Sequence, residues 1–108
     1  MPKKKNIASK DYQEYLIESL KDPKEAAAYL NAALEEEDMP ELFLLSLRNV
    51  ADAHGVQWLA EETHLNRENL YRMLSKKGNP VLSSLYEVLG ALGLKLAIEQ
   101  RRKKHIAA

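Results

Sequence analysis

The chain has 108 residues, of which 45% are hydrophobic, and its four glycines and four prolines leave little room for long disordered tracts, so we expect one small core. It has no cysteine, and its histidines at positions 54, 64 and 105 lack the spacing of metal ligands, so we expect no disulfide, metal or cofactor. No apolar run approaches the roughly 20 residues that span a bilayer, and no signal-peptide segment follows the first lysines. These features predict a cytoplasmic protein without a membrane partner.

The formal net charge is zero, but the charges are segregated along the chain. Residues 11–41 contain ten acidic residues against Lys21 and Lys24, a balance of −8. Residues 64–108 contain nine basic residues against three acidic ones, a balance of +6. This layout suits two partners of opposite charge, nucleic acid and a basic protein, although solvated helix faces would give the same composition.

Residues 1–10 contain four lysines without apolar periodicity, which predicts a flexible basic arm that either attracts phosphates or stays solvated. Residues 11–21 place Tyr12, Tyr15 and Leu16 on one face at helical spacing. Together with the next helix, residues 11–38 are expected to form an acidic helical extension.

That second helix has a strong start signal at Asp22 and Pro23. Asp22 is expected to cap it, Pro23 suits its first position, and Glu25 can reach back to the cap. Its last turn is expected to contain the acidic run 35–38, which the negative end of the helix dipole disfavours. A locally unfavourable sequence of this kind can be retained for a partner, and Asp38 is also expected to cap the third helix.

The third helix is predicted over residues 39–53 and should end near Gly55, a residue that tolerates a left-handed cap. Its many leucines indicate burial beneath the helices that follow. Residues 57–73 then have helical spacing on both sides of a break at 63–66, with Ala60 at the point where two short helices would touch. This pattern predicts a helix-turn-helix within a domain spanning residues 39–93.

The second of these short helices presents a polar outer face. Asn66 is a suitable N-cap, while arginine and asparagine side chains suit guanine and adenine edges, and a glutamate can accept from cytosine. The face and its cap comprise Asn66, Arg67, Glu68, Asn69, Tyr71 and Arg72. A helical hairpin with a solvated face would show the same spacing.

After the helix that closes at Gly93, apolar residues alternate at Leu94, Leu96 and Ile98, as in a strand with one apolar face. A lone strand needs a backbone partner, and no other strand is evident. We therefore expect residues 94–108 to form a dimerising strand and a basic tail, with the strand pairing to a second copy. The N-terminal helices are the alternative dimer surface.

The two short helices, the basic loop LSKKGNP and the following helix resemble the XRE, or lambda-repressor-like, helix-turn-helix family. More narrowly, HLNRENLYRMLSKKGNPVLSSLYEVLGALGLKLAI is similar to the HigA-like addiction-module antidotes, which are encoded beside a toxin. The resemblance implies an all-α fold of five to six short helices with an N-terminal helical extension. Two departures are His64 and Gln57-Trp58. Many members have glycine in place of His64, so we expect a left-handed backbone there, which histidine tolerates at some cost. In place of Gln57-Trp58 many have Thr-Gln, with the glutamine bracing a phosphate.

These arguments give three sets of candidate residues. The DNA-binding set is Gln57, Asn66, Arg67, Glu68, Asn69, Tyr71, Arg72, Lys76, Lys77 and Asn79. The toxin-binding set is Tyr12, Tyr15, Leu16, Tyr29, Glu35, Glu36 and Glu37. The dimer set is Leu94, Leu96 and Ile98.

The resemblance implies an antitoxin that binds operator DNA as a dimer, represses its own operon and neutralises a RelE-, ParE- or HigB-like toxin. A stand-alone phage-type or metabolic repressor is the alternative. The sequence offers no lysine, arginine, glutamate and histidine cluster on a predicted sheet for acid-base chemistry, so we do not expect an enzyme.

Overall fold

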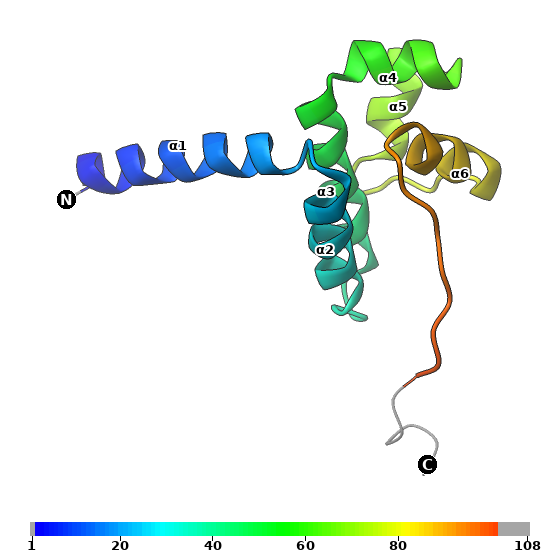
Figure 1. Ribbon diagram of the computed structural model, residues 1–108, viewed down its shortest axis with the longest axis horizontal. Coiled ribbons are helices and arrows are strands. Elements are labelled where there is room, and N and C mark those ends of the chain that lie inside the picture. The colour runs from blue at the N-terminus through cyan, green and yellow to red at the C-terminus, as the bar shows by residue number, and fades with distance from the viewer. Residues whose placement is uncertain (1, 102–108) are drawn as a thin grey trace.

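Six helices form the regular structure of residues 2–101, the part of the chain that the computed structural model describes, with side chains described from Asp11 onward (Figure 1). Their bounds are α1 Pro2–Ser19, α2 Pro23–Leu34, α3 Pro40–His54, α4 Val56–Thr63, α5 Arg67–Met73 and α6 Leu82–Ala91. The predicted all-α class is confirmed for these residues.

Helix α1 extends away from the other helices, and only its C-terminal end joins the core (Figure 1). Leu20, just beyond the helix, is buried, and Leu16 packs against the core from the last turn. The helix begins at Pro2, whereas the sequence predicted a flexible arm over residues 1–10. The described part of this segment, residues 2–10, is helical instead, as the absence of glycine and of an internal proline there permits.

The start of α2 matches the prediction, because the Asp22 carboxylate accepts a hydrogen bond of 3.0 Å from the Lys24 amide and Pro23 takes the first position. Its end does not. The helix stops at Leu34, so the acidic run 35–38 follows the helix and does not form its last turn. The expected cap on α3 is also wrong, because Met39 holds that position and makes no side-chain capping bond.

Helix α3 is the centre of the core. Helices α1, α2 and α4 all contact it, and its Leu47 and Val50 are completely buried. One buried cluster contains residues of α2 to α6 and the residues just after α1, α5 and α6. Its members are Leu20, Ala26, Leu30, Leu47, Val50, Ala51, Ala53, Leu59, Ala60, Leu70, Leu74, Val88, Leu89 and Leu92. Because α2 supplies Ala26 and Leu30 to this cluster, it is part of the same folded unit as the helices after residue 39.

The turn between α4 and α5 is built from local hydrogen bonds. His64 adopts the left-handed conformation with φ 61° and ψ 21°, as expected for this position. The Asn66 side chain caps α5 by accepting from the Asn69 amide at 2.8 Å. Thr63 Oγ1 is buried and donates to the Leu59 carbonyl at 2.7 Å, which fixes the end of α4. These contacts fix the direction in which α5 leaves the turn.

The expected strand over residues 94–98 is absent from the structure, which has no strand in residues 2–101. Gly93, at φ 80°, ends α6, and the Leu94 amide donates to the Leu89 carbonyl at 2.8 Å. Leu94 then packs against the core of its own chain. The segment then runs on without regular structure beside α2 and Phe43 of α3, and neither helix offers a strand edge for pairing.

The conformation of His64 leads to a stability prediction. We expect His64→Val to lower the free energy of unfolding by about 1 to 2 kcal/mol, because a β-branched residue strongly disfavours left-handed backbone. His64→Asn should stay within about 0.5 kcal/mol of the wild type, since asparagine tolerates this region. Urea unfolding of the two variants would check this, and equal stability of both would contradict the strained turn.

Candidate nucleic-acid interface

Helix α5 presents a polar face opposite its buried side. Leu70 is buried against the core, while Arg67, Glu68, Asn69 and Arg72 are exposed, as is the cap residue Asn66. Two arginines and two amide side chains therefore lie together on one short helix whose orientation is set by its cap. Such groups can donate to base edges and to phosphate oxygens.

Tyr71 does not belong to this free face. Its ring lies 5.0 Å from the guanidinium carbon of Arg48 on α3, and the side chain is only half exposed. A cation over the face of an aromatic ring is attracted by the ring quadrupole. Tyr71 therefore helps to join α5 to α3, a role that the sequence prediction missed because helical spacing alone cannot show that Arg48 lies opposite.

The loop after α5 extends the polar surface. Lys76, Lys77 and Asn79 are exposed there, and the last two line an open hollow with Asn69 and Arg72 of α5. The hollow brings two cationic and two amide groups together, so the helix and loop form one continuous surface. Lys76 lies outside this lining but in the same loop.

Gly78 allows this loop to lie close to α5. A Cβ atom on Gly78 would lie 2.2 Å from the carbonyl oxygen of Met73, which is closer than atoms can approach. The Gly78 amide also donates to the Ser75 carbonyl at 2.9 Å, and Ser75 Oγ donates to the Arg72 carbonyl at 2.8 Å. The glycine and these two bonds hold the loop against the end of the helix.

At the start of α4, Gln57 is exposed and its Nε2 donates to Glu61 Oε2 at 3.2 Å. The neighbouring Trp58 stacks on His54, with ring centroids 5.8 Å apart and planes inclined by 24°. Trp58 therefore packs on the last residue of α3 while remaining 39% exposed. Gln57 remains accessible to a ligand at the cost of a weak, exposed hydrogen bond.

The predicted toxin-binding residues Tyr12, Tyr15, Leu16 and Tyr29 fall into two groups, one exposed and one packed against the fold. Tyr12 and Tyr15 on α1 are 63% and 71% exposed, so they are available to a partner. Tyr29 is instead half-buried, and its hydroxyl accepts a 2.8 Å hydrogen bond from Asn49 Nδ2. Leu16 packs against the core as well, so these two residues stabilise the fold.

The acidic run has a partner that the sequence did not reveal. Glu35 and Glu36 are exposed, whereas both carboxylate oxygens of Glu37 accept hydrogen bonds from Arg101 Nη1, at 2.9 and 3.0 Å. After α6 the C-terminal segment runs down beside the helices (Figure 1), and its Arg101 side chain reaches the turn that follows α2. Only the tertiary structure brings these residues, 64 positions apart, into contact.

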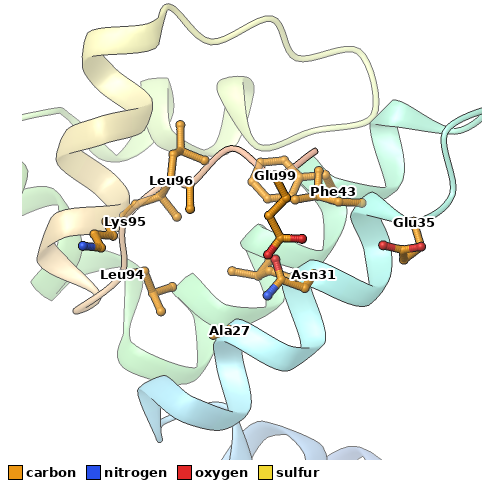
Figure 2. A pocket seen from close by; sticks show the side chains of 12 residues that line it. Ala27, Asn31, Glu35, Phe43, Leu94, Lys95, Leu96 and Glu99 are labelled. Carbon is orange, nitrogen blue, oxygen red and sulfur yellow. The ribbon is translucent and has the colours of Figure 1, made fainter. Parts of the chain in front are cut away.

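A groove lies between α2, Phe43 of α3 and the C-terminal segment (Figure 2), and its volume is about 370 Å³. Ala27 and Leu30 of α2 line one side and Leu94 to Ala97 the other. Of the predicted dimer residues, Leu94 is half-buried here, while Leu96 is partly exposed and Ile98 is 99% exposed. Ile98 is the one of the three that is fully free to contact another molecule.

No group of His, Cys, Asp or Glu side chains suited to a metal ion occurs among the residues whose side chains are described. In the same part of the chain, no helix has the length and apolarity needed to cross a membrane. The described surfaces include a cationic face with amide groups on α5 and its loop, and an acidic side formed by residues 11–18 of α1 and the run 35–38 that follows α2.

These features define a class: a small helical protein with one cationic face and one separate acidic surface. A family model described as "Probable addiction module antidote protein" matches residues 8–100, and the chain belongs to this family. A protein of Haemophilus influenzae, described as uncharacterized, is 34% identical over 87 residues, which cover 81% of this chain and 89% of that relative. No solved structure matches the chain significantly.

The close approach of Gly78 to the Met73 carbonyl can be tested by substitution, with Gly90 as the control position. We expect Gly78→Ala to destabilise the fold by about 1 to 3 kcal/mol, because the added methyl group must displace the loop or the end of α5. Gly90→Ala is the control, since a Cβ there meets nothing within 4 Å and alanine favours the helix by up to about 1 kcal/mol. Thermal unfolding should show opposite shifts for the two variants, and an unchanged midpoint for Gly78→Ala would contradict the packing argument.

Proposed function

We propose that this protein is the antitoxin of a type II toxin-antitoxin module, which neutralises a RelE-, ParE- or HigB-like toxin and represses its own operon by binding operator DNA as a dimer. The observation on which the proposal rests is the match of the antidote family over residues 8–100. An antidote implies a cognate toxin as its partner. The proposed place of action is the cytoplasm, and the proposed activity is binding without catalysis.

The DNA-binding half of the proposal is supported by the exposed face of α5. Arg67, Asn69 and Arg72 are exposed while Leu70 is buried, and the resemblance of α5 to a helix-turn-helix recognition helix suggests insertion into the major groove. Lys76 and Lys77 in the following loop are placed to contact phosphates beside that groove. The acidic segments lie elsewhere, which avoids repulsion of DNA.

The dimer is supported by a segment near the C-terminus whose backbone groups form no described hydrogen bond and whose side chains are exposed. Within the described chain, no hydrogen bond is formed by the backbone of residues 95–100, and Ile98 is fully exposed. Pairing of this segment with the same segment of a second copy would satisfy those groups and cover Ile98. Leu94 contributes indirectly, because it holds the segment against its own core.

The toxin-binding half is supported by α1. This helix extends from the body, and Tyr12 and Tyr15 are large, exposed and close to acidic residues (Figure 1). Tyrosine is enriched among residues that dominate binding energy, and carboxylates nearby would steer a basic toxin toward the helix. Tyr29 and Leu16 would contribute by fixing the helices that present this surface.

A stand-alone phage-type or metabolic repressor is the alternative function. It would use the same face of α5 and leave α1 as a dimer or ligand-binding element. The exposed tyrosines and the antidote family favour the antitoxin. The presence or absence of a small basic protein in the neighbouring gene distinguishes the two.

For DNA binding, we expect Arg67→Ala and Arg72→Ala each to weaken affinity for the DNA upstream of the operon by about 1 to 3 kcal/mol and to relax preference at one base pair. Lys77→Ala should weaken binding equally for all sequences, because phosphate contacts do not depend on the base. Mobility-shift titrations at one fixed salt concentration provide the measurement.

The matched control is Lys21→Ala, which also removes one positive charge but lies at the end of α1, paired with Glu18. Its affinity for the same DNA should equal that of the wild type. If both arginine variants also bound like the wild type, α5 would not be the recognition helix.

For toxin binding, we expect Tyr12→Ala and Tyr15→Ala each to weaken affinity for the protein encoded by the neighbouring gene by about 2 kcal/mol. Alanine preserves helix propensity, so the effect would report lost contacts. Whole-chain variants are required, because removal of residues before 39 would also remove core residues of α2. Tyr86→Ala is the control, since Tyr86 is an exposed tyrosine on α6. Isothermal titration provides the measurement, and full affinity of both α1 variants would move the toxin site elsewhere.

A further inference from the structure

The ion pair between Arg101 and Glu37 joins the C-terminal segment to the turn after α2. Both side chains are largely exposed, at 55% and 62%. An exposed ion pair contributes little to stability, because water screens it and two long side chains must be ordered. We use the name strap for residues 94–101. The pair fixes the last residue of the strap to the turn after α2. A strap held in this way is poised to be displaced.

The surface beneath the pair has the chemistry of a site for a basic side chain. An open hollow of about 490 Å³ is lined there by Ala33, Leu34, Glu36, Glu37, Pro40, Phe43 and Arg101. Its lining combines apolar side chains, including Leu34, which is 50% exposed, with the carboxylates of Glu36 and Glu37. An arginine fits such a site, because its stem packs on apolar surface while its planar head binds carboxylate oxygens.

The groove in Figure 2 continues from this hollow along the strap, and the two share Leu34 and Phe43. Leu94 and Leu96 of the strap line the groove from the side opposite α2. No described hydrogen bond holds the backbone of residues 95–100, so among the described residues the contacts of the strap are apolar ones and the Arg101 pair. Another extended segment with an arginine could make the same contacts.

We propose that the hollow around Glu36 and Glu37 is a docking site for an arginine of the cognate toxin, and that Arg101 of the strap occupies it in the free protein. The strap therefore competes with the toxin and lowers its affinity. This inference rests on the proposed antitoxin function and deepens it by assigning a second contact beyond α1.

Charge complementarity identifies the occupant as a basic protein. Glu35, Glu36 and Asp38 are exposed around the site, so an anionic ligand would be repelled. A toxin that cleaves RNA needs a positive surface to hold phosphates, and an arginine on that surface would meet the hollow directly. Arg101 already demonstrates that this corner accepts a guanidinium with both carboxylate oxygens of Glu37.

The test compares charge-matched variants of the strap in the whole chain, titrated with the protein encoded by the neighbouring gene. Arg101→Ala should bind that protein about two- to fivefold more tightly than the wild type, which is the range expected for release of an exposed pair. Lys95→Ala removes the same charge from the same segment but no ion pair that the structure records, so it should show a smaller gain. Arg101→Lys keeps the charge and loses the planar head, so its affinity should lie between those of the wild type and Arg101→Ala.

Glu37→Gln provides an opposing measurement. It releases the strap but also removes the acceptor for the toxin's arginine, so it should bind more weakly than Arg101→Ala by about threefold or more, if that arginine pair is worth the usual exposed-pair energy. Equal affinities of Arg101→Ala and Lys95→Ala, or of Arg101→Ala and Glu37→Gln, would overturn the inference while leaving the antitoxin function intact. If the wild type failed to bind the neighbouring protein at all, the proposed function would fail, and this inference with it.

Discussion

The rest of the structure depends on the burial of α3, which is covered by neighbouring helices on several sides. Leu47 and Val50 are completely buried, and α1, α2 and α4 all contact this helix. Apolar burial is worth about 25 cal/mol per Å², so a helix covered by several neighbours supplies much of the stability of a small domain. The position of α5, which packs on α4, therefore follows from the packing of α3. The cationic face and the acidic side are both mounted on this shared core.

Packing also decides which polar side chains remain available for binding. Tyr29 and Tyr71 both lie at suitable helical positions for a surface role, yet Asn49 binds the first and Arg48 lies over the second. Both partners come from α3, the helix that α1, α2 and α4 all contact. A tyrosine that finds a partner across a helix interface gains packing as well as a polar contact. Tyr12 and Tyr15 have no such partner among the described residues because α1 extends beyond the body.

The zero net charge conceals two surfaces of opposite sign, and the C-terminal strap reaches the acidic one. It leaves the core beside α6 and ends at the acidic turn after α2, where Arg101 meets Glu37. A basic residue from the positive half of the chain thus neutralises part of the negative half. If the two surfaces bind DNA and a basic protein, an element that touches one surface and also contains the candidate dimer residues can couple the two binding events.

The sequence by itself determined the helical class, the starts of α2 and α5, and the left-handed turn at His64. Each of these depends on local chemistry: Asp22 and Asn66 bind amides two or three residues away, and His64 needs only its own backbone conformation. The sequence also indicated that the polar residues Arg67, Asn69 and Arg72 would be exposed and that Leu70 would be buried, as the structure shows. Tertiary structure alone decided the Tyr29 and Tyr71 contacts, the end of α2 before the acidic run, and the strap in place of a strand. Those outcomes depend on residues up to 64 positions apart, such as Glu37 and Arg101, and periodicity contains no information about which distant groups the folded chain brings together.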